Sequence, residues 1–265
     1  MAVAALPMYD LPAVRWANDR FWDFLRDRLR AGGVAAPDAL DRTTPLDEIW
    51  TRPDLLLAQT CGYPFASRLR GVVRILGTPC YAAAGCEGPR YASWLVVRRE
   101  EAASSLAELR GRVIAINSRD SQSGHHALRS ALVAAGQSGA FAAGLVVTGS
   151  HRASLDAVAT ARADLCAIDC VTWALLRRHE PEVTAALRTI GLTPSAPGLP
   201  LVTAGSNPAA VVEALSAALA ALGREPSLAA CREALLWQRF APLTDADYDE
   251  ILTQARATAT LAPFG

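Results

Sequence analysis

The sequence predicts an α/β protein in which parallel strands are flanked by helices. Short runs of β-branched and apolar residues, typical of buried strands, alternate with longer segments whose apolar residues have helical spacing. This alternation is the pattern of sheets built from successive strand–helix units. Polar and glycine residues directly follow several of the apolar runs, and α/β sheets place their ligands at such strand ends.

The expected strands are apolar runs that end in polar or glycine-containing turns. They lie at residues 3–8, 54–60, 72–78, 91–98, 113–116, 144–148, 164–169, 185–192 and 199–204.

The expected helices carry an apolar stripe with charged or small residues on the other side. They lie at residues 12–31, 100–110, 125–135, 153–162, 170–178, 208–222, 226–238 and 245–258. Gly32 and Gly33 end the first helix, and the tail beyond residue 257 is expected to fray.

Composition limits the class of protein. The chain has 265 residues, 51% hydrophobic and 20% charged, with a net formal charge of zero, which suits one large or two small globular domains. A neutral chain lacks the basic face that nucleic acid requires. The N-terminus has no basic region before Asp10, and no stretch reaches transmembrane length, so we expect no membrane insertion and, as written, a cytoplasmic location.

Two residue types exclude particular chemistries. The chain contains arginine but no lysine. This excludes a Walker A lysine, a lysine Schiff base and a Ser-Lys catalytic dyad. The six cysteines form no Cys-x-x-Cys pair and have mostly apolar neighbours, which predicts buried free thiols and no metal site. A disulfide between Cys80 and Cys86 stays open as an alternative.

The most informative segment is 111–126. A strand at 113–116 leads through a polar turn into a helix that begins near Gly124. The free N–H groups and partial positive charge of a helix N-terminus make this turn a candidate anion cradle. Any single serine in this turn could be an N-cap and have no further role. Three hydroxyls, those of Ser118, Ser121 and Ser123, exceed what a cap needs.

Other strand ends have a similar character. Gln59 and Thr60 end one strand, although Gly62 and Pro64 also fit a plain turn. The segment 149–154, Gly-Ser-His-Arg-Ala-Ser, is a second strand-to-helix turn with serine and histidine at the helix start.

The ordered set of these motifs resembles the periplasmic-binding-protein-like (type 2) phosphate/phosphonate ABC transporter substrate-binding family. The motifs are Met-Tyr-Asp at 8–10, Gln-Thr-Cys-Gly-Tyr-Pro at 59–64, Asp-Ser-Gln-Ser-Gly at 120–124, Gly-Ser-His-x-x-Ser at 149–154, and Asp164 followed by Ala-Ile-Asp at 167–169. The sequence departs from the family pattern at Gln122, where a small hydroxyl is expected.

The resemblance implies a two-lobed fold in which each lobe is a mostly parallel sheet flanked by helices. Lobe 1 would comprise 1–90 and 205–265, and lobe 2 would comprise 91–204. Hinge strands are expected near 89–97 and 199–204, and the lobes would close over a ligand in the cleft between them.

The resemblance also implies a set of ligand-binding residues. The oxyanion loop would contribute Ser121, Ser123, Gly124 and His125. The first lobe would contribute Tyr9, Gln59 and Thr60. The hinge would contribute Tyr91 or Ser93, and the second lobe would also contribute His151 and Asp169. Asp169 would accept from an amine or hold His151 in one tautomer. Structural roles are expected for Asp164, His126 and His179.

The resulting hypothesis is a solute-binding protein for a small oxyanion-bearing ligand, phosphonate- or phosphate-like, with no catalytic residues and no cofactor. It would deliver the ligand to an ABC transporter permease or act as a sensor, and it would be periplasmic if the start is truncated. The alternative is an enzyme, of lyase or cofactor-biosynthesis type, in which Ser123, His125, His151 and Asp169 supply a nucleophile, bases and a carboxylate. A purely structural or interaction module explains the polar strand ends less well.

Overall fold

The computed structural model describes residues 2–264, which divide into two compact units. Unit 1 comprises Met1–Ala82 and Gly198–Tyr248, and unit 2 comprises Ala83–Pro197 and Asp249–Gly265. The chain therefore passes between the units three times. The expected lobe boundaries at 90 and 205 differ from these, and the segment after Tyr248 belongs to the second unit rather than the first.

Unit 1 contains a five-stranded sheet of order β1-β2-β12-β3-β13. Its elements are β1 Val3–Ala5, α1 Arg15–Ala31, α2 Leu46–Thr51, β2 Leu55–Gln59, α3 Gly62–Pro64, η1 Phe65–Leu69, β3 Val73–Tyr81, β12 Leu201–Ala204, α8 Ala209–Leu222, η4 Pro226–Leu228, α9 Ala229–Ala234, β13 Trp237–Ala241 and η5 Asp245–Tyr248. The pair β1–β2 is parallel, whereas β12 is antiparallel to β2 and to β3, and β13 is antiparallel to β3.

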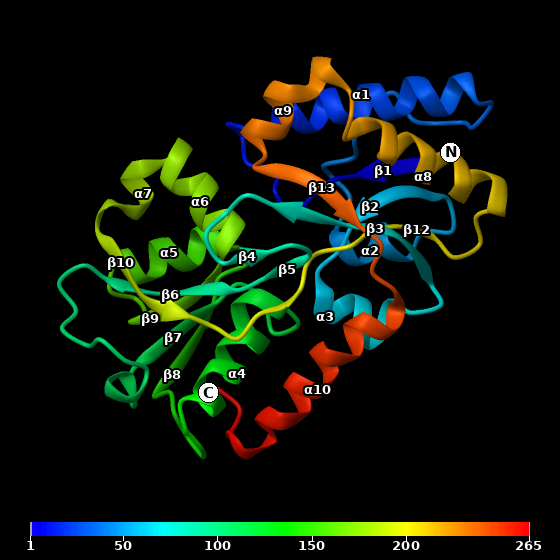
Figure 1. The fold of residues 1–265 in the computed structure, drawn as a ribbon. Helices are drawn as coiled ribbons and strands as arrows, with labels where there is room; N and C mark the ends of the chain where they lie inside the picture. Colours follow the sequence, from blue (N-terminus) through cyan, green and yellow to red (C-terminus); the bar gives the residue numbers. More distant parts are fainter. Residues whose placement is uncertain (1, 265) are drawn as a thin grey trace. The chain divides into compact units, whose positions relative to one another are not determined.

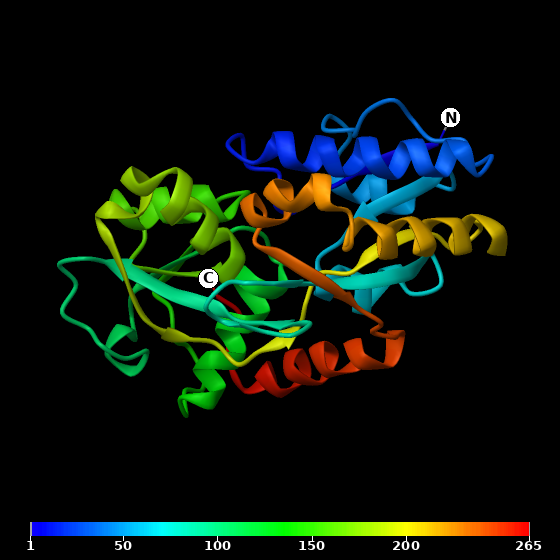
Figure 2. The same cartoon turned by 45° about the horizontal axis from the view of Figure 1, so that its top comes forward.

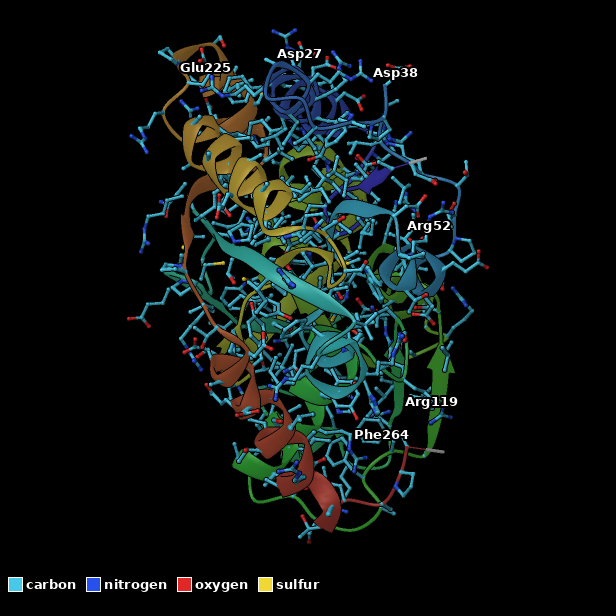
Figure 3. The ribbon with its side chains drawn as sticks, turned by 90° about the vertical axis from the view of Figure 1, so that its right-hand side faces the viewer. Asp27, Asp38, Arg52, Arg119, Glu225 and Phe264 are labelled. Atoms are coloured by element: carbon cyan, nitrogen blue, oxygen red, sulfur yellow. The ribbon has the colours of Figure 1, made fainter. Side chains whose placement is uncertain are left out.

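Helices α1, α8 and α9 cover one face of this sheet, and α2 and α3 lie on the other (Figure 1). Helices α1 and α8 run side by side (Figure 2). The buried stripe of α1 includes Phe21, Trp22 and Leu25, while its charged side chains face outward, as Figure 3 shows for Asp27. The core of unit 1 therefore lies between these helices and the sheet.

Unit 2 contains a second five-stranded sheet, of order β10-β6-β9-β7-β8, and a small sheet of order β11-β5-β4. Its elements are β4 Cys86–Glu87, β5 Arg90–Tyr91, β6 Ser93–Arg98, η2 Ala107–Leu109, β7 Val113–Ile116, η3 Gln122–His126, α4 Ala127–Ala134, β8 Gly144–Val147, α5 His151–Ala159, β9 Leu165–Asp169, α6 Cys170–His179, α7 Pro181–Ala185, β10 Leu187–Leu192, β11 Ala196–Pro197, α10 Asp249–Ala257 and η6 Thr258–Thr260. Strands β7, β8 and β9 are mutually parallel, and β6 is antiparallel to β9.

Helices α5, α6 and α7 lie over one face of the second sheet, and α4 lies over the other with α10 beside it (Figure 1). The tail after α10 is packed rather than frayed. Phe264, labelled in Figure 3, is 2% exposed, and the guanidinium of Arg129 on α4 lies 5.2 Å from its ring centroid. Arg129 also donates to the carbonyls of Thr258, Leu261 and Ala262. These hydrogen bonds correct the expectation of a loose tail.

Three other expectations were wrong. Both sheets are mixed rather than mostly parallel. The segment 100–110 is largely irregular, with only the short turn η2, because Glu101 and Glu108 accept hydrogen bonds from the backbone N–H groups of Ala103 and Ser104 and so favour local turns over a regular helix. The expected helix 226–238 stops at Ala234, and Trp237 begins the edge strand β13, where its aromatic ring packs against Phe21 at 5.9 Å.

Asp164 joins two strands of unit 2 just before β9 begins. One carboxylate oxygen accepts from Arg98 at 2.7 Å, and the other accepts from the backbone N–H of Val113 at 3.0 Å. Burial acts to raise the pKa of Asp164, but the hydrogen bonds from Arg98 and Val113 outweigh it and hold the pKa below its ordinary value of 3.8. Asp164 therefore has a structural role.

Replacing this carboxylate should destabilise unit 2. We expect Asp164→Asn to lower the free energy of unfolding by about 1–3 kcal/mol, because a hydrogen bond to a charged group is lost in a partly buried setting. Since folding lowers the pKa of Asp164, the difference should be full at neutral pH and should disappear as the pH falls through the folded-state pKa below 3.8. Urea unfolding of both proteins at neutral and acidic pH measures it; a difference that does not change with pH would contradict the assignment.

Candidate functional site

The topology of unit 2 gathers polar turns along one edge of its sheet. Strands β7, β8 and β9 are parallel, so the turns that follow them meet at their carboxyl ends. Strand β6 runs the opposite way and begins at that same edge, where Ser93 pairs with Asp169. The candidate residues of β6, β9, the β7–η3 turn and the β8–α5 turn therefore lie along one edge.

The β7–η3 turn is held by Ser121. Its hydroxyl accepts from the N–H of Gly124 at 3.0 Å, and its carbonyl accepts from the N–H groups of His125 and His126. Ser121 is thus the N-cap of η3, the role that the sequence allowed for a single serine. The helix continues through α4, and the turn therefore carries the N–H groups with which a helix begins.

Ser123 contacts a histidine from the neighbouring turn. Its Oγ lies 2.8 Å from Nε2 of His151, the first residue of α5. Burial lowers the pKa of His151 to about 4, against a smaller raising effect of the Ala167 backbone. His151 is therefore neutral at neutral pH, and its tautomer decides whether the Ser123 hydroxyl donates or accepts.

Gly124 is required by close packing. A Cβ atom added to it would lie 1.9 Å from Asn117 Oδ1 and 3.3 Å from His151 Cε1. Asn117 Oδ1 is buried and has no hydrogen-bond partner among residues 2–264. Asn117 was not among the predicted site residues, although its position directly after a buried strand was an available signal.

His125 is tied to its surroundings. Its Nδ1 lies 2.5 Å from the carbonyl oxygen of Arg119, and its ring packs edge-on against Phe264 at 5.7 Å. Burial lowers the pKa of His125, so it too favours the neutral form. These contacts anchor the loop to the C-terminal tail.

Asp169 and Ser93 differ in how their polar atoms are used. Asp169 Oδ1 accepts from the N–H groups of Val171 and Thr172, which makes it the N-cap of α6. Ser93 is 1% exposed, its N–H donates to Thr193 Oγ1, and its own hydroxyl has no partner within the described part of the chain. A buried hydroxyl of this kind is a candidate ligand group. Tyr91, on β5, is buried as well.

The candidates of unit 1 lie at the ends of β1 and β2. Tyr9 packs edge-on against Tyr81 at 5.0 Å, and Gln59 donates to the Tyr81 hydroxyl and to the Leu199 carbonyl. Tyr9, Gln59 and Tyr81 border a mostly apolar cavity of about 50 Å³ between the sheet and helices α1 and α8. Thr60 is fully buried, and its N–H donates to the Pro200 carbonyl.

Across residues 2–264, no group of three or more His, Cys, Asp or Glu side chains could hold a metal ion. In that same part of the chain no helix is both long and apolar enough to cross a membrane.

The packing around Gly124 can be tested with a matched pair of variants. Gly124→Ala should cost about 1–3 kcal/mol of stability, because its Cβ overlaps Asn117 Oδ1. Shortening the neighbour should relieve the overlap, so Gly124→Ala combined with Asn117→Ala should cost less than the two single variants added together. Chemical unfolding of the four proteins measures this coupling, and strictly additive costs would show that the two residues do not meet.

The neutrality of His151 predicts a pH dependence. Because its folded-state pKa of about 4 lies below the ordinary 6.5, the unfolded chain binds more protons between these values. Stability should therefore fall as the pH drops from 6.5 toward 4, by about 2–3 kcal/mol for this group. His151→Gln should reduce that slope in urea unfolding measured between pH 7 and pH 4, and the lowered pKa of His126 should account for part of what remains. A variant with the wild-type slope would show that another group titrates.

Solved structures with this fold are widespread, whereas no curated protein matches the sequence. PhnD1 from Prochlorococcus marinus, in complex with methylphosphonate, has a TM-score of 0.74 and 17% identity, over 96% of this chain and 97% of that one. A binding protein component of an ABC phosphonate transporter from Pseudomonas aeruginosa has a TM-score of 0.74 and 20% identity, over 100% and 90%. A Xanthomonas citri protein bound to ATP has a TM-score of 0.72 and 18% identity, over 97% and 96%.

These structural likenesses establish the two-sheet α/β fold of type 2 periplasmic binding proteins, as the motifs implied. The sequence itself matches a family model over residues 52–248, which is most of the chain. That family is described as ABC transporter, phosphonate, periplasmic substrate-binding protein, and this chain belongs to it.

Proposed function

We propose that this protein is a non-catalytic solute-binding protein that captures a small phosphonate- or phosphate-like oxyanion and delivers it to an ABC transporter permease. The observation that carries the proposal is the turn from Ser121 to Gly124. It presents the leading N–H groups of a helix beside the Ser123 hydroxyl at the carboxyl edge of the unit 2 sheet. Family membership supports the same ligand class.

The recognition chemistry would rely on dipoles rather than on a cationic side chain. Backbone N–H groups at a helix start stabilise an anion through short, charge-assisted hydrogen bonds. His151 is neutral and shares a hydrogen bond with Ser123, so it orients the hydroxyl without adding charge. In the tautomer with a proton on Nδ1, Nε2 would accept the serine proton and leave the oxygen lone pairs facing the site; in the other tautomer, the serine hydroxyl would be free to donate to the anion. Anion binding favours the second.

Further ligand contacts are proposed for Ser93, Tyr91, His125 and Asp169 in unit 2 and for Tyr9, Gln59 and Thr60 in unit 1. Ser93 has the strongest support among them, because its buried hydroxyl has no partner among the described residues.

An enzymatic function is favoured by one observation, the 2.8 Å contact between Ser123 Oγ and His151 Nε2, which has the geometry of a nucleophile and its base. The low pKa of His151 argues against an enzymatic function. A histidine with a pKa of about 4 is a weak base at neutral pH, and a general base works best when its pKa lies near the working pH. We therefore infer binding without turnover.

The test of the binding loop is Ser123→Ala. Loss of one buried donor to a charged ligand should weaken binding of methylphosphonate, the compound bound by PhnD1, by about 1–3 kcal/mol, or roughly 5- to 150-fold. Calorimetric titration with methylphosphonate, phosphate, phosphite and sulfate measures the affinity and ranks the anions. Ser138→Ala is the matched control, because Ser138 is an exposed serine of the same unit and should bind like wild type.

Two results would contradict the proposal. Equal affinity in Ser123→Ala and wild type would remove the loop from the site. Phosphorus NMR after prolonged incubation with the ligand should show only the starting compound, and a new phosphorus signal that requires the protein would establish turnover instead.

A further inference from the structure

Two cysteines that are distant in sequence meet in unit 2. Cys86, on β4, and Cys170, the first residue of α6, have their Sγ atoms 3.4 Å apart although 84 positions separate them in the chain. Formation of a disulfide would require the sulfurs to approach to about 2.05 Å, a movement within reach of side-chain rotation and small backbone shifts.

The backbone holds these two residues together. The carbonyl of Gly85 accepts from the N–H of Ala92 at 2.8 Å, and the carbonyl of Ala92 accepts from the N–H of Cys170 at 3.1 Å. A Cβ atom on Gly85 would lie 2.8 Å from the Cβ of Cys170, and Gly85 has a φ of +105°. Only glycine suits both demands. The close approach of the two thiols is therefore built into the fold.

The two thiols differ in access. Cys170 has 0% of its surface exposed, whereas Cys86 is partly exposed and can meet a reagent from solution. The hydrogen bond with Cys86, burial and the nearby Asp169 carboxylate all raise the pKa of the Cys170 thiol. Cys86 is therefore the thiol that reacts first, and Cys170 is placed to react second.

We propose that Cys86 and Cys170 form a reversible dithiol–disulfide site that is oxidised by a low-molecular-weight disulfide. The Cys86 thiolate, having given its proton to solvent, attacks the reagent disulfide; a mixed disulfide forms and one reagent thiolate leaves and takes up a proton. The Cys170 sulfur then attacks the Cys86 sulfur, loses its proton and releases the second reagent thiol. The two protein thiols are oxidised by two electrons, and the reagent disulfide is reduced to two thiols.

The cross-link would connect two segments that carry candidate ligand residues. Cys86 pairs with Tyr91 across the β4–β5 ribbon, and Cys170 directly follows Asp169 at the start of α6. Oxidation would fasten the ribbon to the helix start and close a long loop of chain, which should raise the melting temperature of the protein. The pairing of the two thiols does not depend on which ligand the protein binds.

The experiment is oxidation of the whole chain with oxidised glutathione. After denaturation, a chromogenic thiol reagent should count four thiols instead of the six of the reduced protein. Trypsin cleaves after arginine and should release residues 75–90 joined to residues 163–177. These peptides also contain Cys80 and Cys166, so variants are needed to identify the bonded pair.

Three variants make the assignment. After treatment with oxidised glutathione, Cys86→Ser should keep all of its remaining thiols reduced and should show no rise in melting temperature. In Cys170→Ser, the reaction should end at the mixed disulfide between Cys86 and glutathione. The double variant Cys80→Ala with Cys166→Ala should still form the cross-link and should revert with dithiothreitol. Six thiols in the treated wild type, a wild-type mixed disulfide that never resolves, or a cross-link that survives Cys86→Ser would each overturn the proposal.

Discussion

Parallel pairing of β7 with β8 is the constraint on which the candidate site depends. The register that joins Ile116 to Val147 continues beyond the strands, where the N–H groups of Thr148 and Gly149 donate to the carbonyls of Ile116 and Asn117. These bonds keep the two turns together as they leave the sheet. The contact between Ser123 and His151 follows from this register, because a one-residue slip would turn the flanking side chains to the opposite face.

Burial then determines the electrostatic character of the site. His151 and His126 both lose the ability to carry charge at neutral pH, since burial lowers their pKa values to about 4 and about 3. Two neighbouring arginines are engaged elsewhere: Arg152 pairs with Asp156 and Glu180, and Arg129 donates to the carbonyls of the C-terminal tail. The turn from Ser121 to Gly124 itself has no charged side chain and offers oriented dipoles, which suit a small anion.

The sequence predicted the parts of the structure that depend on local pattern. The apolar runs at 113–116 and 164–169 became β7 and β9, and the serine N-cap before η3 follows from chain-local hydrogen bonding. The strand direction of β12, which makes the first sheet mixed, depends on a partner far away in sequence. Strand β13 also depends on distant partners. The residues around Trp237 are compatible with a helix, and it is the pairing with β3 and the packing against Phe21 that make this segment a strand.

The candidate site shows the same division more sharply. Ser121, Ser123 and Gly124 were recognisable because a strand, a polar turn and a helix follow one another directly. Asn117 follows a buried strand, but the sequence does not show that its amide oxygen lies where a Cβ of Gly124 would be. The Cys86–Cys170 pair was not recognisable, because no spacing reveals that Gly85 brings the two thiols together. In both cases a glycine marks the place where two segments meet closely. In a related sequence, a glycine next to a polar or reactive side chain is therefore the first place to look for a tertiary contact of this kind.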